Sequence, residues 1–381
     1  MHAVRHVLLL GSVLTLAACG GSEPEVESEP LGRTQAPLHQ AAPDRRIEGA
    51  YIIKVRDGGE ARSVAAAAGV SPRNVYALLN GFAATLDADQ LHALRSHPQV
   101  EYVEEDQLFE KATTQTQAPW GLDRMDQRGL PLNGTYSYTS TGSCANAYII
   151  DTGINVTHTQ FGGRASNAYD VFGGTGADCQ GHGTFVAGIV GGSTYGVAKG
   201  IKLRGVRVLD CAGSGSTSGV LSGIDWVRSN HVKPAVATLS LCGAYSTALN
   251  SAVTNLVNSG VFVAVPACNN TADACSYSPS SATAATTVGS TTNTDARAAY
   301  SNYGSCVDIY APGSSITSAW YTTGTATTTM SGTSVSAGYV AGLAALYKCT
   351  YGDASQATIE AWLKSQGTTL PFGKLIYQGG L

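Results

Sequence analysis

Residues 331–346 read Ser-Gly-Thr-Ser-Val-Ser-Ala-Gly-Tyr-Val-Ala-Gly-Leu-Ala-Ala-Leu, a glycine-flanked pair of hydroxyl residues followed by an apolar run. The helix that this run predicts is apolar around most of its circumference, so we expect it to be buried. A serine at the N-terminus of a buried helix lies beside free backbone N–H groups and the positive end of the helix dipole. Ser334 is therefore either an ordinary helix cap or a nucleophile whose attack generates an oxyanion.

Short apolar runs and helical patterns alternate along the chain on either side of this helix. The runs are Ala147–Ile150, Leu203–Leu209, Val236–Leu241, Val261–Val265, Thr286–Gly289 and Val307–Tyr310. Helices are expected over residues 182–191, 218–229 and 247–259. Runs that are apolar throughout are typical of strands buried on both faces. We therefore predict an α/β fold, a doubly wound and mainly parallel sheet with helices on both faces.

Composition excludes several classes of function. The chain has 381 residues, of which 43% are hydrophobic and 13% charged, and its net charge is -4. Because it contains no basic run, we expect no nucleic-acid partner. It also has no Gly-x-x-x-x-Gly-Lys-Ser/Thr segment, which excludes the usual phosphate-binding loop.

The N-terminus predicts export. Arg5 precedes an apolar stretch, Val7–Ala18, that is too short to span a bilayer, so residues 1–19 read as a signal peptide. The stretch ends in Leu-Ala-Ala-Cys, which resembles a bacterial lipobox with Cys19 as the lipidated new N-terminus; a plain cleavable signal is the alternative. We expect a precursor anchored in the cell envelope, an extracellular enzyme, or both, with this lipid as the only link to a membrane.

Two further segments precede the α/β region. Residues 20–46 are rich in Glu and Pro and predict a disordered tether. Residues 48–110 predict a small α+β unit of ferredoxin-like β-α-β-β-α-β order. Its expected elements are Tyr51–Val55, Glu60–Ala68, Val75–Leu86, Ala88–Ser96 and Val100–Glu104. Residues 111–118 are polar, lack structure signals and predict an exposed, cleavable junction before a domain at 119–381.

Four side chains of the α/β region suit acyl transfer. Asp151 follows an apolar run, His182 opens a helical pattern, and Asn269 follows the run that ends at Val265. With Ser334 they supply a nucleophile, a base, a group that orients the base, and an amide donor for an oxyanion. Each alone has an ordinary structural explanation, and only the four together indicate acyl transfer.

The order and setting of these residues resemble a known family. Asp151-Thr152-Gly153, Gly181-His182-Gly183-Thr184 and Ser331-Gly332-Thr333-Ser334 look like the motifs of the subtilases, the subtilisin-type serine proteases, and most closely of their proteinase K and aqualysin branch. The resemblance covers about residues 48–349. It implies a subtilisin-like catalytic domain over 119–381, an inhibitory propeptide over 48–110, and a monomeric secreted serine endopeptidase made as a self-processing zymogen.

The resemblance also implies roles. Ser334 would attack the scissile carbonyl, His182 would transfer the proton, and Asp151 would orient His182, while Asn269 and the Ser334 N–H would hold the oxyanion. Peptide substrates would lie between two strands, made by Gly213, Ser214, Gly215 and by Ser240, Leu241, Cys242. The other wall of the specificity pocket would be Pro266, Ala267 and Cys268.

Metal and disulfide sites follow from the same resemblance. Eight cysteines lie after residue 140, an even number that favours disulfides in an exported chain. Cys179–Cys211 and Cys275–Cys306 match pairs of the aqualysin type. A structural calcium ion would bind Asp308 and the carbonyls of Thr283 and Ala285. A second, weaker calcium site would involve Asp123, Asp126 and Gln127.

Two departures from the family pattern affect the pocket. Cys242 and Cys268 replace glycines on its facing walls, and they either form a disulfide or remain free thiols. We expect a pocket that accepts only small residues or is closed; two buried free thiols with little effect on the pocket are the alternative. A degenerate subtilase that binds peptides without cutting them is therefore the alternative function. Cys144 and Cys349 are left to pair with each other, and residues 350–381 are expected to be a packing cap.

Overall fold

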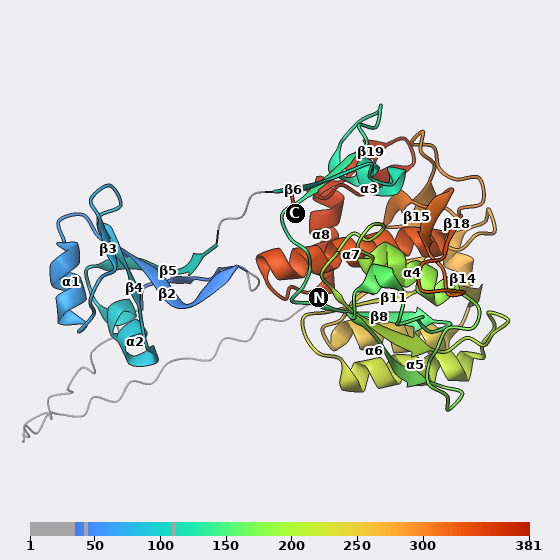
Figure 1. Cartoon of the computed structure of the whole chain (residues 1–381), viewed down its shortest axis with the longest axis horizontal. Coiled ribbons are helices and arrows are strands. Elements are labelled where there is room, and N and C mark those ends of the chain that lie inside the picture. Colours follow the sequence, from blue (N-terminus) through green and yellow to red (C-terminus); the bar gives the residue numbers. More distant parts are fainter. Residues whose placement is uncertain (1–34, 42–44, 109–111) are drawn as a thin grey trace, which may run out of the picture.

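The computed structural model describes residues 35–41, 45–108 and 112–381, which form a small N-terminal unit and a large α/β unit (Figure 1). The residues of the signal peptide, including Cys19, lie outside the described part. In the part of the chain that is described, no helix has both the length and the apolar character needed to cross a membrane.

The small unit has the predicted ferredoxin-like order. Its elements are β2 (Arg46–Val55), α1 (Ala61–Ala67), β3 (Asn74–Tyr76), β4 (Gly81–Thr85), α2 (Ala88–Ser96) and β5 (Val100–Gln107). The strands pair antiparallel in the order β5-β2-β4-β3, and Phe82, Leu94 and Val103 are fully buried beneath the helices. Asp87 caps α2 in a capping box with Gln90, which accounts for the position at which this helix begins.

The prediction of a disordered tether over residues 20–46 is wrong for the C-terminal part of this segment. Leu38–His39 form β1, which adds a parallel edge strand to β5, and Ala36 is buried in the core of the small unit. A two-residue strand carries no apolar period, so its own sequence could not reveal it. Pairing with the edge of β5 supplies the hydrogen bonds that order this segment.

The large unit is built on the predicted parallel sheet. Its strands lie in the order β19-β20-β16-β15-β13-β11-β8-β10-β9, and all neighbours except β19 and β20 are parallel. The strands are β8 (Asn146–Asp151), β9 (Ala165–Asp170), β10 (Lys202–Arg207), β11 (Ala235–Leu239), β13 (Phe262–Pro266), β15 (Thr286–Thr291), β16 (Ile309–Pro312), β19 (Thr368–Leu370) and β20 (Gly373–Leu375). Strands β8, β11, β13 and β15 are buried along their whole length, as their apolar runs predict.

Helices cover both faces of this sheet, so the doubly wound prediction is confirmed (Figure 1). One face packs on α5 (Thr217–Asn230) and α6 (Thr247–Asn258). The other packs on α3 (Trp120–Asp126), α4 (His182–Gly191), α7 (Thr333–Tyr351) and α8 (Gln356–Gln366). Helix α7 is the predicted apolar helix; almost all of its residues are buried, and it crosses beneath the centre of the sheet.

Short elements complete the large unit. They are β6 (Thr113–Thr116), β7 (Thr135–Tyr138), β12 (Gly243–Ala244), β14 (Tyr277–Ser278), β17 (Ile316–Ala319), β18 (Thr327–Met330) and two 3₁₀ turns at Thr159–Phe161 and Ala274–Ser276. Strand β6 pairs antiparallel with β7, so the prediction that residues 111–118 lack structure is wrong for this part. The polar threonines favour a strand, but only the distant partner β7 determines that one forms.

Four disulfides link the large unit, and they include both pairings that were inferred from the resemblance. The pairs are Cys144–Cys349, Cys179–Cys211, Cys242–Cys268 and Cys275–Cys306, with Cα separations of 5.8, 5.0, 5.9 and 5.3 Å. Cys242 and Cys268 are therefore paired rather than free. The C-terminal residues do more than cap the fold, since β19 and β20 extend the main sheet.

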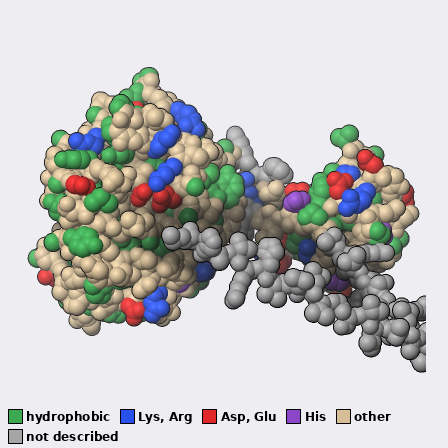
Figure 2. All heavy atoms as spheres, turned by 180° about the vertical axis from the view of Figure 1, so that it is seen from behind, with side chains coloured by type: hydrophobic (Ala, Val, Ile, Leu, Met, Phe, Trp, Pro, Cys, Tyr) green, Lys and Arg blue, Asp and Glu red, His purple; other side chains and the backbone are tan. Residues whose placement is uncertain are grey.

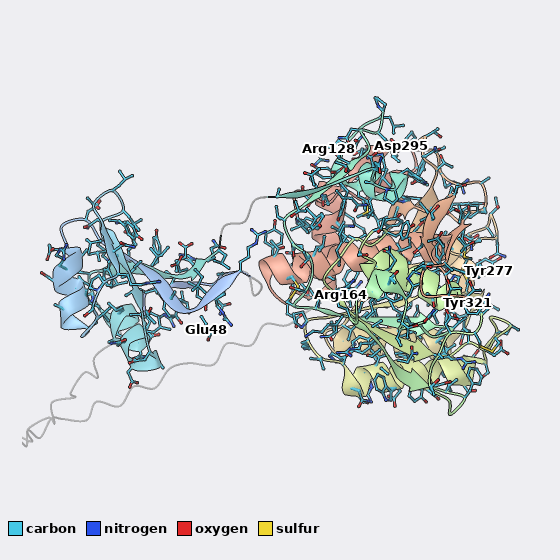
Figure 3. The ribbon with its side chains drawn as sticks, in the orientation of Figure 1. Glu48, Arg128, Arg164, Tyr277, Asp295 and Tyr321 are labelled. Atoms are coloured by element: carbon cyan, nitrogen blue, oxygen red, sulfur yellow. A yellow bond between two sulfur atoms is a disulfide. The ribbon has the colours of Figure 1, made fainter. Side chains whose placement is uncertain are left out.

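The two units meet at the C-terminal end of α7. Gln40, Arg46 and Glu105 of the small unit line a hollow of about 260 Å³ together with Tyr351 and Gly352. Ser334 lies 17 residues from Tyr351 along α7, about 26 Å at the helical rise per residue. In Figure 3, Glu48 lies on the side of the small unit that faces the large unit, and Tyr277 lies at the far edge of the large unit.

Candidate active site

Three elements bring the predicted triad residues to one edge of the sheet. Asp151 is the last residue of β8, His182 is the first residue of α4, and Ser334 lies in the first turn of α7. The carboxyl ends of parallel strands and the starts of the following helices meet at the same edge. Gly181 makes the sharp entry to α4 at a φ of 114°, and a side chain there would collide with the Trp320 ring.

Asp151 and His182 form a close pair. Nδ1 of His182 lies 2.9 and 2.8 Å from the two carboxylate oxygens of Asp151, whose side chain is fully buried. Burial of the imidazole lowers the pKa of His182, but the charge and hydrogen bond of Asp151, together with the charge of Asp178, outweigh it and raise that pKa above its ordinary value. The carboxylate thus holds the ring by Nδ1, and Nε2, on the opposite side, has no hydrogen-bond partner in the described part of the chain.

Asp178 organises the turn before His182. Its carboxylate accepts hydrogen bonds from the Thr152 hydroxyl at 2.9 Å, from the Gly181 N–H at 2.7 Å, and from the Thr184 N–H and hydroxyl at 2.9 and 2.6 Å. One side chain therefore fixes both the residue after Asp151 and the first turn of α4. The charge of Asp178 also lies at the N-terminus of this helix, where a carboxylate is stabilising.

The Ser334 hydroxyl points toward a carbonyl. It donates to the Ser240 backbone oxygen at 3.1 Å, and among the described residues no hydrogen bond joins it to His182. The Ser240 hydroxyl in turn donates to the Ser334 carbonyl at 3.3 Å. Gly332, not a serine, caps α7, and no side chain caps this end. Ser334 is thus not the N-cap, and its hydroxyl is free of any capping bond.

Asn269 lies beside the start of α7 with its amide oriented. Its Oδ1 accepts from both the N–H and the hydroxyl of Thr333 at 2.9 Å. Within the described part of the chain, its Nδ2 has no acceptor. The bonds to Thr333 therefore direct the amide donor outward, on the same side as the start of α7, where the Ser334 N–H has no acceptor among the described residues.

A cleft of about 720 Å³ runs beside His182. Both predicted substrate strands line it, Gly213–Gly215 on one side and Ser240–Cys242 on the other. Apolar side chains along it are Leu209, Val220, Leu241, Tyr245 and Leu249. Strands β10 and β11 lie on either side of β8. The segments that follow their carboxyl ends thus form the two predicted walls of the cleft.

The third predicted wall does not line this cleft. Pro266 and Ala267 are buried, and Cys268 is 1% exposed. Cys268 adopts a φ of 79°, and its sulfur is bonded to that of Cys242. The side chains of Pro266, Ala267 and Cys268 are thus closed off from the cleft that Ser240–Cys242 line.

The Asp308 region does not fit the calcium ion that the resemblance implies. Oδ1 of Asp308 accepts from the Lys364 ammonium at 2.9 Å, and Oδ2 accepts from the Thr287 N–H at 2.9 Å. Lys364 also donates to Glu360 at 2.6 Å. Burial lowers the pKa of Lys364, but these two carboxylates outweigh it and raise that pKa. Because the Lys364 ammonium already pairs with Asp308, a divalent cation at this carboxylate would first have to displace Lys364.

The region around Asp123 and Asp126, the second predicted calcium site, differs from the Asp308 region in its hydrogen bonds. Asp123 accepts from the Gly134 N–H at 2.7 Å, and one oxygen of Asp126 accepts from the Ser137 N–H at 2.8 Å. The other oxygen of Asp126 is buried and has no hydrogen-bond partner among the described residues. Burial, and to a lesser degree the charge of Asp123, raises the pKa of Asp126. A buried, unpartnered carboxylate oxygen beside a second acid fits a hard cation, although no group of three or more potential His, Cys, Asp or Glu ligands occurs among the described residues.

Sequence reasoning missed three residues that support the site. Asp178 and Thr333 orient His182 and Asn269, and Gln180 accepts from the His182 N–H at 2.8 Å. Only their positions in the sequence could have indicated these residues. Asp178 and Gln180 lie in the turn just before His182, and Thr333 directly precedes Ser334. The roles of Asp178 and Thr333 depend on contacts with Thr152 and Asn269, which lie far away in the chain, whereas the Gln180 contact is local.

The surface around these units carries little charge. On the face in Figure 2, acidic and basic side chains are scattered, and most of the large unit presents uncharged groups. Arg124, which is fully buried, pairs with Asp295 at 2.7 Å.

Comparison with known proteins agrees with this geometry. Residues 148–376 match the Subtilase family, and residues 50–112 match Peptidase inhibitor I9. An extracellular serine proteinase of Thermus sp. (strain Rt41A) is 46% identical over 93% of this chain and 92% of its own length. Proteinase R of Parengyodontium album is 40% identical over 91% of this chain and 90% of its own.

A solved structure of a subtilisin-like protein is also similar to this chain. The crystal structure of a cold adapted subtilisin-like serine proteinase is 48% identical, covers 69% of this chain and 99% of its own, and has a TM-score of 0.68. The resemblance inferred from the three motifs is confirmed, and the fold and the I9 segment match. The chain belongs to the subtilase family: it is a secreted, subtilisin-like serine endopeptidase made as a zymogen with an I9 propeptide.

Proposed function

We propose that Ser334 is the nucleophile, His182 the general base and acid, and Asp151 the group that orients His182 in hydrolysis of peptide bonds. The observation that carries this assignment is the pair of short contacts between His182 Nδ1 and the Asp151 carboxylate. This contact fixes the tautomer with the lone pair on Nε2, where it can accept the serine proton. Buried Asp151 also stabilises the imidazolium that forms during attack.

Substrate would release the nucleophile. The Ser334 hydroxyl is bonded to the Ser240 carbonyl in the free enzyme. A peptide that pairs as a strand with Ser240–Cys242 offers its own N–H to this carbonyl. The serine hydroxyl then rotates about its Cα–Cβ bond into another staggered position, toward His182. Its oxygen attacks the scissile carbonyl carbon while its proton passes to Nε2.

The oxyanion would bind between Asn269 and α7. Attack converts the carbonyl oxygen into an alkoxide, and Nδ2 of Asn269 together with the Ser334 N–H would donate to it. When the tetrahedral intermediate collapses, His182 returns its proton to the leaving amine and an acyl-enzyme remains. Water, deprotonated by His182, then hydrolyses this ester and regenerates Ser334.

Self-processing tests the assignment. We expect the full chain to cut itself between Lys111 and Gln117, and a Ser334→Ala chain to remain full length. Strand β6 lies within this interval and pairs with β7, so its pairing has to open before the bond reaches Ser334. Electrophoresis and N-terminal sequencing follow both chains. A Ser334→Ala chain that processes normally would contradict the assignment, and a wild-type chain that stays intact and binds peptides would favour the non-cutting alternative.

Processing would also release the enzyme if Cys19 carries a lipid. The lipid would remain with the propeptide, so the precursor would fractionate with membranes and the mature enzyme with the medium. The comparisons support secretion alone. A Cys19→Ser chain that fractionates like the wild-type precursor would exclude the anchor.

For calcium, we propose the Asp123 and Asp126 region in place of Asp308. The unpartnered Asp126 oxygen supports it, and the Lys364 ammonium argues against Asp308. This ion would stabilise the fold and take no part in peptide hydrolysis.

A further inference from the structure

Two neighbouring strands lead into the facing walls beside Ser334. Strands β11 and β13 are paired in parallel through Val236–Phe262, Ala237–Val263 and Thr238–Ala264. Both therefore end at the same edge, one leading to Ser240–Cys242 and the other to Cys268 and Asn269. The wall residues thus start as near to each other as paired strands, about 5 Å apart.

The disulfide prevents these walls from separating. The Cα atoms of Cys242 and Cys268 are 5.9 Å apart. A flat side chain held between two walls needs about 7 Å between their atoms, since each carbon–carbon contact takes roughly 3.5–4.0 Å. The bridge therefore leaves no room for an aromatic ring or a long aliphatic chain at this point.

The exposure of the wall residues also indicates that the pocket is closed at the disulfide. Cys242 is exposed in the cleft, whereas Ala267 is 0% and Cys268 1% exposed. An open pocket between the two walls would expose both of them. The cleft therefore stops at the disulfide and continues between Gly213–Gly215 and Ser240–Ser246, where Leu241 and Leu249 provide apolar surface.

The backbone of Cys268 indicates that the bridge is maintained against a local preference. Its φ of 79° lies in the left-handed region, which favours glycine and is sparsely used by other residues. Residues in such conformations persist only where their surroundings fix them, and they concentrate at functional sites. Here the fixing contacts are the disulfide and the bond from the Asn302 N–H to the Cys268 carbonyl at 3.0 Å.

We propose that the Cys242–Cys268 disulfide is a specificity-determining element that restricts cleavage to bonds after glycine, alanine or residues of similar size. Affinity then comes from substrate residues further from the cut, which lie along the cleft between Gly213–Gly215 and Ser240–Tyr245. This inference rests on the proposed role of Ser334. The bridge also braces the residue before Asn269, so the amide that would hold the oxyanion stays in place when the pocket is empty.

The test measures kcat/KM for peptides that differ only in the residue before the cut: glycine, alanine, leucine or phenylalanine. For the mature wild-type enzyme we expect alanine to be preferred to phenylalanine by at least about 100-fold. Replacing both cysteines by glycine (C242G/C268G) removes the bridge and both side chains, and we expect the ratio to fall by at least tenfold. The double serine variant C242S/C268S keeps side chains of similar size without the bond, and we expect an intermediate ratio.

The matched control is C144A/C349A, which removes a disulfide far from the cleft and should keep the wild-type ratio. Where a variant does not fold, the wild-type enzyme reduced with a phosphine under native conditions replaces it, with thiol counts identifying the bond that opened. Wild-type cleavage after phenylalanine as efficient as after alanine, or an unchanged ratio in C242G/C268G, would overturn the proposal. Failure of the proposed function is distinguishable from failure of the specificity proposal. If Ser334 is not the nucleophile, the Ser334→Ala enzyme will still cleave the peptides with the wild-type preference. If neither the wild-type enzyme nor C242G/C268G cleaves any of the peptides, the specificity proposal and the proposed function are both overturned.

Discussion

The carboxylate of Asp178 accepts a hydrogen bond from the hydroxyl of Thr152 at 2.9 Å, and this bond joins the loop after Asp151 to the turn before His182. The same carboxylate holds Gly181 and Thr184 on either side of His182. The distance between the acid and the imidazole is therefore set by a residue that touches neither the substrate nor Ser334. Asp178 is a positioning residue, and its effect is measurable in two ways.

Asp178→Asn should lower kcat about 10- to 100-fold with little change in KM. An amide replaces one acceptor oxygen by a donor, so either the Thr152 contact or the Thr184 contacts are lost, and a small displacement of His182 has a large effect on proton transfer. The variant should also have a lower pKa for His182, because the charge of Asp178 raises it. Steady-state rates across pH test both effects.

The matched control is Asp225→Asn, which removes an exposed carboxylate paired only with Arg228. It should leave kcat and the acid limb of the profile unchanged. A normal kcat in Asp178→Asn, or an acid limb that moves to higher pH, would contradict the positioning role.

The pH profile of the wild-type enzyme follows from the Asp151–His182 pair. His182 acts as a base only when neutral, so kcat/KM should rise with pH as His182 loses its proton. Because the pKa of His182 is raised, the midpoint of this rise should lie above 6.5, the ordinary value for histidine. A midpoint below 6.5 in the free enzyme would show that burial of the ring outweighs the charges of Asp151 and Asp178.

Asn269→Ala should lower kcat about 10²- to 10³-fold and leave KM nearly unchanged. The amide is held by Thr333 and would donate only to the oxyanion, so its loss affects the transition state and not substrate binding. Asn270→Ala is the neighbouring control, and its kcat should match that of the wild type. Equal losses in both variants would indicate a general disturbance of the loop.

The sequence predicted those features that repeat along the chain and missed those that depend on a single partner. Apolar runs located the central strands and the helix behind Ser334, because burial on both faces requires continuous apolar residues. Polar segments gave no such signal, and β1 and β6 form only because β5 and β7 offer free edges.

The same distinction applies to the site. Motif order predicted Asp151, His182 and Ser334 as the triad, but the buried side of the pocket depends on how closely β11 and β13 approach, and spacing does not encode that distance. Lys364 lies 56 residues after Asp308, so its competition with calcium depends on how α8 packs on the sheet. A resemblance transfers ligand positions but not the side chains that other segments place beside them.

Lys364→Met should reduce stability by about 1 kcal/mol, the upper end for a partly exposed ion pair, or roughly 2–4 °C in Tm for a domain of this size. Lys364→Met removes the ammonium that Asp308 and Glu360 share, and each carboxylate then lacks its counter-ion. Scanning calorimetry of the mature enzyme measures the change. Lys374→Met, which removes only an exposed bond to Thr369, is the control and should leave Tm unchanged.

Calcium should stabilise the mature enzyme through Asp126 and not through Asp308. Adding a chelator should lower Tm of the wild type, because the buried oxygen of Asp126 then loses its counter-ion beside Asp123. In Asp126→Asn, Tm should no longer respond to chelator or to added calcium, whereas Asp308→Asn should keep the full response. The comparison is internally controlled, since both variants remove one negative charge from the same domain. A response lost in Asp308→Asn and retained in Asp126→Asn would mean that calcium displaces the Lys364 ammonium, and that the ion pair exists only in the calcium-free enzyme.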